Sequence, residues 1–64
     1  MKKGVVKFFN DSKGFGFIRA EGEENDIFVH ASGLIDDIRD NDVVVFDVQE
    51  GRRGPNAVNV KIAD

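Results

Sequence analysis

The sequence contains no cysteine, no tryptophan and no tyrosine, and it has a single proline and a single histidine among 64 residues. Without cysteine the chain forms neither a disulfide nor a thiolate metal site, so its stability must come from one small hydrophobic core. No apolar run approaches the roughly 20 residues that cross a bilayer, and the opening MKKG lacks the apolar segment of a secretory signal. We therefore expect one cytoplasmic domain over residues 1–64, with no membrane partner.

Charge is plentiful but unevenly distributed along the chain. The net charge is −3, yet residues 1–20 carry five basic side chains and one acidic, residues 21–50 carry ten acidic and one basic, and residues 51–64 carry three basic and one acidic. If the two basic ends meet in space, a basic face and an acidic face coexist on one domain, which permits a polyanionic partner. The alternative, an ordinary mixed surface, stays open on charge alone.

Alternation of apolar and polar residues is the dominant pattern of the chain. It predicts five strands, at residues 3–10, 14–21, 26–30, 43–50 and 56–62. Between 31 and 42 we expect only a single helical turn, capped by Ser32, whose Leu34, Ile35 and Ile38 face the core. Five short strands without a substantial helix fit an all-β, five-stranded antiparallel barrel of the OB type. An SH3-like barrel of similar size is the competing fold.

The same alternation assigns side chains to the two faces of each strand. The predicted inward positions are Ile18, Ala20, Ile27, Val29, Val44, Phe46, Val48, Val58, Val60 and Ile62. Phe15, Phe17, Phe28 and His30 are then left on the outer face. Burying one phenylalanine stabilises a fold by roughly 1.5–3 kcal/mol, so three rings outside the core forgo stability that a small domain needs.

Stacking of unpaired nucleobases accounts for such a face, because base-on-ring contacts contribute about 1–3 kcal/mol per base and tolerate any sequence. Lys7 and Lys13 would meet phosphates at the rim, and Gly14 and Gly16 would let a nucleic-acid strand approach closely. The other interpretation of this face is that residues 31–42 or a second copy of the chain cover it.

Phe8 and Phe9 are adjacent, so an ideal strand sends one ring to the core and the other to the outer face. Alternation does not decide which, because a bulge near Gly4 would exchange them.

Four segments resemble the cold-shock domain family in order and spacing, across essentially the whole chain: KGFGFI at 13–18, DIFVH at 26–30, GVVKFFN at 4–10 and EGRRGPNAVNV at 50–60. The resemblance implies a five-stranded OB-type barrel that binds single-stranded RNA and single-stranded DNA with low sequence specificity. The resemblance also implies that, as in bacterial relatives, a protein with this activity acts as an RNA chaperone and as a regulator of transcription and translation in cold or stress adaptation. The positions that the resemblance assigns to binding are Lys7, Phe8, Asn10, Lys13, Phe15, Phe17, Phe28, His30 and Arg53.

Three departures from the family pattern predict a shorter or weaker footprint. Phe8 stands where most relatives carry tryptophan, and Ala31 follows His30 where bacterial members usually have an aromatic residue. Residues 31–42 contain no phenylalanine, tyrosine or tryptophan, whereas relatives often place another stacking ring there.

Other chemistry finds little support in the sequence. With one histidine and no cysteine we expect no metal site and no cofactor, and Ser32 has no base partner, so we expect neither an enzyme nor a small-molecule substrate. Asp36, Asp37, Asp40 and Asp42 lack the glycine and terminal glutamate of a calcium loop. Two rivals stay open: an adaptor that binds proline-rich peptides along the aromatic face, and an OB domain held on structured ribosomal RNA. We expect a monomer.

Overall fold

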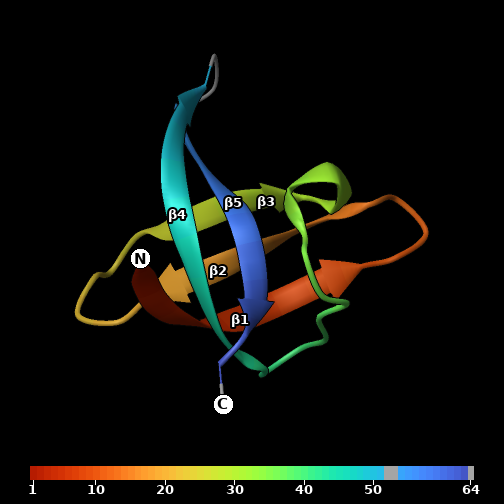
Figure 1. Cartoon of the computed structure of the whole chain (residues 1–64), viewed down its shortest axis with the longest axis horizontal. Helices are drawn as coiled ribbons and strands as arrows, with labels where there is room; N and C mark the ends of the chain where they lie inside the picture. The colour runs from red at the N-terminus through yellow and green to blue at the C-terminus, as the bar shows by residue number, and fades with distance from the viewer. Residues whose placement is uncertain (52–53, 64) are drawn as a thin grey trace.

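The computed structural model describes residues 1–51 and 54–63, which form five strands and one short 3₁₀ helix (Figure 1). The elements are β1 (Lys2–Asn10), β2 (Phe15–Ala20), β3 (Asp26–His30), η1 (Ala31–Gly33), β4 (Val43–Gly51) and β5 (Gly54–Ile62). The strand bounds agree with the sequence prediction to within two residues at each end. The described part of the chain contains no helix with the length and apolar character needed to span a membrane.

The strands close into a barrel in the order β1-β2-β3-β5-β4. Pairing is antiparallel except for a short parallel contact between β3 and β5. The predicted all-β, five-stranded barrel is confirmed. Because β1 pairs with both β2 and β4, the barrel has the OB arrangement rather than the SH3-like one.

Strand β1 contains a bulge that decides which of its two phenylalanines faces outward. The β1–β2 register shifts between Val6 and Phe8, so Lys7 is an extra residue in β1. Val6 is therefore fully buried, and Phe9, three residues further on, also packs against the core. Phe8 is 39% exposed and lies on the outer face. Alternation in the sequence left both outcomes open. The bulge considered there was near Gly4, whereas the structure has it at Lys7, three residues later.

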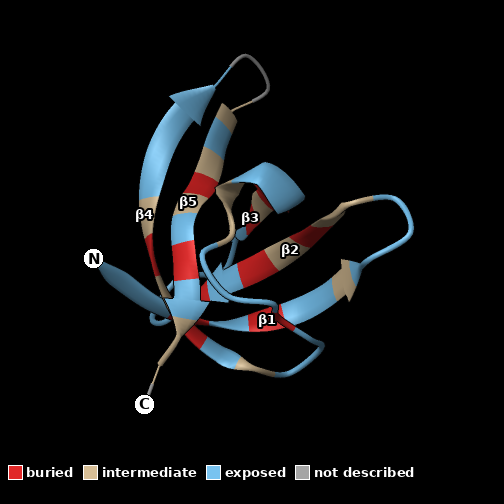
Figure 2. Ribbon diagram, turned by 45° about the vertical axis from the view of Figure 1, so that its right-hand side comes forward, coloured by how far each residue is buried: buried red, intermediate tan, exposed pale blue. Residues whose placement is uncertain are grey.

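Among residues 1–51 and 54–63, ten buried side chains form the core, and buried positions alternate with exposed or half-buried ones along β2 (Figure 2). Its members are Val6, Ile18, Ala20, Ile27, Val29, Ile38, Val44, Phe46, Ala57 and Val60. All inward predictions for β2 and β3 are confirmed, as are those for Val44, Phe46 and Val60, while Ile62 is half-buried against the core.

Two inward predictions are wrong. Val58 is only half-buried, and its neighbour Ala57 takes the inward place. The β4–β5 register shifts around Asn59, which adopts a positive φ of 54°. The residues before and after Asn59 therefore do not follow one alternation, and Ala57 and Val60 both face the core. Val48 is 36% exposed, because the β4–β5 pair extends past the rest of the barrel at the C-terminal end of β4 (Figure 1).

The connection between β3 and β4 begins with η1, whose cap is His30 rather than the predicted Ser32. The Nδ1 atom of His30 accepts a hydrogen bond from the backbone N–H of Ser32 at 3.1 Å. After η1 the backbone is extended, with Leu34 at φ −91° and ψ 135°, so helical spacing no longer applies. Leu34 packs against the core and Ile38 is buried, as predicted, but Ile35 is 62% exposed.

The acidic side chains of this connection accept hydrogen bonds from the backbone of the barrel. Asp40 accepts from the N–H of Phe9 at 2.9 Å, and Asp36 accepts from the N–H of Ile62 at 3.0 Å. These carboxylates tie the connection to β1 and β5, which gives them a structural role. Within residues 1–51 and 54–63, no group of three or more histidine, cysteine or acidic side chains is placed to hold a metal ion.

Candidate nucleic-acid interface

Four phenylalanines and one histidine lie together on the outer face of β1, β2 and β3. Strand β2 supplies Phe15 and Phe17, because the residues at 16 and 18 are buried. Phe17 pairs with Phe8 on β1 and with Phe28 on β3, and Phe15 pairs with His30 on β3. We refer to these five residues as the aromatic surface. Alternation predicted four of them, and the β1 bulge adds Phe8.

The four phenylalanine rings contact one another in a closed circuit. Between ring centroids, Phe17 lies 5.6 Å from Phe8 and 5.8 Å from Phe28, and Phe15 lies 6.3 Å and 6.0 Å from the same two rings. All four separations fall within the range of favourable aromatic pairs. Phe8 is 39% exposed and the other three rings are half-buried. The circuit orients each ring and recovers part of the burial that the core does not provide.

Gly16 supports this arrangement from the inner side of the sheet. A Cβ atom built on Gly16 would lie 2.2 Å from the carbonyl oxygen of Phe8 and 2.8 Å from the Cα of Phe9. The missing side chain therefore makes room for β1, and the sequence-based idea that Gly16 admits a nucleic-acid strand is wrong. Gly14 lies in the turn before β2 with a φ of +74°, a left-handed conformation that favours glycine.

His30 is held in one orientation by a residue that the sequence reasoning had assigned to another role. Its Nδ1 accepts from the backbone N–H of Ser32 at 3.1 Å and lies 2.9 Å from the Ser32 hydroxyl. Because Nδ1 is an acceptor, Nε2 is the ring nitrogen left to donate. His30 is exposed, so it presents an oriented N–H donor at the edge of the aromatic surface.

Asp26 joins two cations at the opposite edge of the aromatic surface. One of its carboxylate oxygens lies 3.2 Å from Lys7 Nζ and the other lies 3.3 Å from Arg19 Nε. Partial desolvation by itself would raise the pKa of Asp26, but the hydrogen bonds and charges of Lys7 and Arg19 together outweigh it and hold the pKa below its ordinary value. Lys7 was predicted as a rim cation; it is exposed and engaged in this pair.

Sequence reasoning missed Arg19 and Asp26. The signal was available in the same alternation, since Arg19 follows Phe17 by two residues and Asp26 precedes Phe28 by two residues. The two are directly paired across β2 and β3, next to the Phe17–Phe28 pair. The outward row of β2 thus continues from Phe17 to a cation, and that of β3 continues from Phe28 to its carboxylate partner.

The remaining predicted rim residues occupy the turn between β1 and β2. Asn10 accepts from the backbone N–H of Lys13 at 3.0 Å through its side-chain oxygen, and its carbonyl accepts from Gly14 at 2.7 Å. Asn10 thus organises the turn, and Lys13 lies exposed on it. The prediction for Arg53 falls outside the described residues.

Replacing Asp26 with asparagine is expected to lower stability at neutral pH but not in acid. The folded pKa of Asp26 lies below its ordinary value of 3.8, so its ion pairs stabilise the fold fully above that value and lose their effect as the pH falls through the folded pKa. Urea titrations of the wild type and Asp26→Asn should give a constant difference in unfolding free energy above about pH 5, and the two curves should converge in strong acid. A difference that persisted unchanged there would rule out the ion pairs as its source.

Comparison with known proteins places this geometry in context. The family model described as 'Cold-shock' DNA-binding domain matches residues 2–63. The chain is 53% identical to the cold shock protein CspA of Staphylococcus aureus strain USA300 and to that of Staphylococcus haemolyticus, over 94% of this chain and 96% of each relative. Among solved structures it is similar to drosophila Unr CSD456, with a TM-score of 0.82 and 26% identity, over 98% of this chain and 26% of that longer one.

Proposed function

This chain belongs to the cold-shock domain family, whose members bind nucleic acid and are not enzymes, and on that basis we propose that it binds single-stranded RNA and single-stranded DNA by stacking unpaired bases on the aromatic surface. The observation that carries this proposal is the circuit of four outward phenylalanine rings with His30 beside it. Every base has a flat face, so such a surface selects unpaired bases over paired ones and discriminates weakly among sequences.

The expected affinity follows from the number of stacked bases. Three or four bases contribute about 3–12 kcal/mol in gross terms, at about 1–3 kcal/mol each. Association and ordering of a flexible strand cost several kcal/mol. A micromolar dissociation constant, which corresponds to about −8 kcal/mol, is the result we expect.

Phosphate contacts make a smaller contribution. Lys7 and Lys13 lie at the rim, but Lys7 is already paired with Asp26 at 3.2 Å. With about two to four phosphate contacts, each giving a slope near −0.7, the dependence of log affinity on log salt should be modest. The acidic residues at 21–26 repel additional backbone and weaken the dependence further.

The cellular role that fits this activity is that of an RNA chaperone. Capture of bases that are already unpaired shifts the equilibrium of an RNA hairpin toward its open form by mass action. Regulation of transcription and translation during cold or stress adaptation would follow from the same capture. A monomer acting in the cytoplasm suffices for this mechanism.

A titration followed by NMR tests the proposal. Adding a short oligothymidylate to the labelled protein is expected to shift the signals of the aromatic surface, with micromolar affinity, whereas a duplex of comparable length is expected to bind at least about tenfold more weakly. Equal affinity for the duplex would contradict stacking. Shifts produced only by a proline-rich peptide or only by folded ribosomal RNA would favour an adaptor or a ribosome-bound domain instead.

A further inference from the structure

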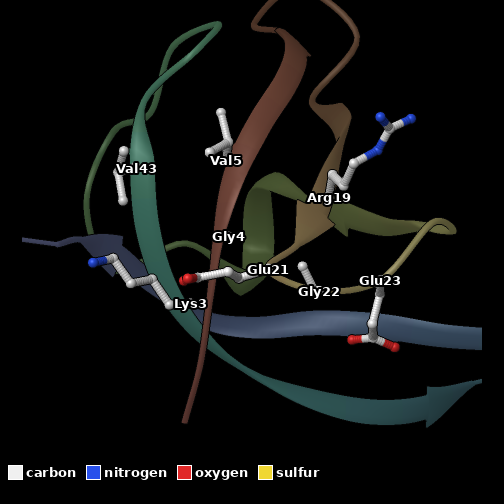
Figure 3. A pocket seen from close by; sticks show the side chains of 9 residues that line it. Lys3, Gly4, Val5, Arg19, Glu21, Gly22, Glu23 and Val43 are labelled. Atoms are coloured by element: carbon white, nitrogen blue, oxygen red, sulfur yellow. The ribbon is translucent and has the colours of Figure 1, made fainter.

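A hollow of about 390 Å³ lies beside the aromatic surface, where β1, β2 and β4 meet (Figure 3). Val5 and Val43 line it from β1 and β4, and Arg19 lines it from β2. Its size is at the lower end of the range for small-ligand sites, which is about 300–1,000 Å³.

The hollow is continuous with the aromatic surface through one row of paired residues. Arg19 follows Phe17 by two residues on β2, so both side chains point to the outer face. Arg19 pairs with Val5 on β1, and Val5 pairs with Val43 on β4. A nucleic-acid strand that leaves the rings at Phe17 therefore meets Arg19 first and the two valines next.

Val5 and Val43 form an apolar floor that the fold leaves uncovered. They are 44% and 40% exposed, and they lie directly opposite each other on neighbouring strands. Directly paired apolar side chains bring their surfaces together, so a flat ligand covers both at once. A nucleobase has the planar, largely apolar face that suits this floor.

Arg19 lies between Phe17 and the hollow, and Asp26 on β3 fixes its guanidinium on the side away from Val5 and Val43 (Figure 3). Asp26 accepts a hydrogen bond from the Nε of Arg19 at 3.3 Å. The two terminal nitrogens of Arg19 extend away from strand β2 in Figure 3. A guanidinium held in this way presents a planar pair of donors that matches two oxygens of a phosphate. Asp26 therefore acts as a positioning residue for Arg19.

We infer that this hollow takes one further nucleotide of the same single strand, with its base on Val5 and Val43 and its phosphate on Arg19. The inference rests on the proposed function. Glu21 and Lys3 both line the hollow, and Glu23, which also lines it, is paired with Lys2 at 3.2 Å, so the charges around the hollow largely offset one another.

The test uses the full chain and oligothymidylates that lengthen by one nucleotide at a time. Methyl signals of Val5 and Val43 are expected to shift only once the strand is long enough to pass the aromatic surface. That same step is expected to raise the affinity of the wild type about threefold to tenfold. Arg19→Gln should abolish most of this increment and reduce the magnitude of the salt slope by about 0.7. Arg39→Gln, the same change on the exposed β3–β4 connection, is the matched control and should preserve both.

Each other outcome is decisive. If the aromatic surface shifts with every oligothymidylate but the valine methyls never move, the extra subsite is refuted and the proposed function stands. If neither set of signals moves, both proposals fall. If the valine methyls shift with protein concentration in the absence of nucleic acid, a second copy of the chain covers the hollow and the inference is overturned.

Discussion

Replacing Phe17 with alanine is expected to weaken the binding of a single-stranded oligothymidylate about fivefold to a hundredfold, because loss of a stacking ring removes about 1–3 kcal/mol per base. Phe17 is the most informative position, since its ring contacts both Phe8 and Phe28 at 5.6 and 5.8 Å. Its removal takes away one stacking face and also loosens two neighbours. Because the chain contains no tryptophan, anisotropy of a labelled oligonucleotide is the suitable measurement.

Two companion variants separate binding from folding. Phe17→Leu keeps an apolar side chain of similar bulk on the sheet but has no aromatic face, so it should retain more stability than Phe17→Ala and still bind weakly. Ile35→Ala removes a large side chain that is 62% exposed on the β3–β4 connection and is not one of the five residues of the aromatic surface, so it should leave affinity unchanged. Wild-type affinity in a folded Phe17→Leu would mean that the rings do not stack on bases.

Gly16→Ala is expected to destabilise the barrel by about 3 kcal/mol, at the upper end of the cost of overpacking. The new methyl group would lie 2.2 Å from the Phe8 carbonyl oxygen, so β1 and β2 must separate. Flexible side chains can yield to a close contact, but here the nearest atoms belong to the backbone of the paired strand. A domain of this size has about 3–5 kcal/mol of stability in total, so the variant should be largely unfolded at modest urea concentrations.

Gly22→Ala is the matched control for this prediction. Gly22 has a φ of +81° and nothing within 4 Å of the added methyl group, so alanine there meets backbone strain without a clash. The expected cost is about 1–2 kcal/mol. Urea unfolding followed by circular dichroism measures both variants. If Gly16→Ala proved no more harmful than Gly22→Ala, the close approach of β1 and β2 at this position would be disproved.

The chain's own alternation was sufficient to predict four of the five residues of the aromatic surface. Phe15, Phe17, Phe28 and His30 share a face because each stands two residues from another on its strand, and that spacing is a local property of extended backbone. The opposite positions, Ile18 among them, are aliphatic and form the core. The conclusion that the rings face outward therefore required no knowledge of how the strands pair.

Phe8 and β5 show where local pattern fails. A bulge at Lys7 exchanges the faces of β1 after Val6, and a register shift around Asn59 does the same in β5. A bulge depends on how the partner strand curves as the barrel closes, which no window of neighbouring residues records. For Phe8, resemblance to the cold-shock domain family supplied the answer that the residues alone left open.

The sequence by itself determined a small five-stranded barrel with a row of rings outside its core, because side-chain spacing and turn residues are written along the chain. Only the tertiary structure decided that the rings form one closed circuit, that Asp26 holds Lys7 and Arg19, and that Ser32 orients His30. These contacts join side chains from different strands or from either side of a turn. The ring circuit and the ion pairs of Asp26 exist only after the strands have paired in one register and the barrel has closed.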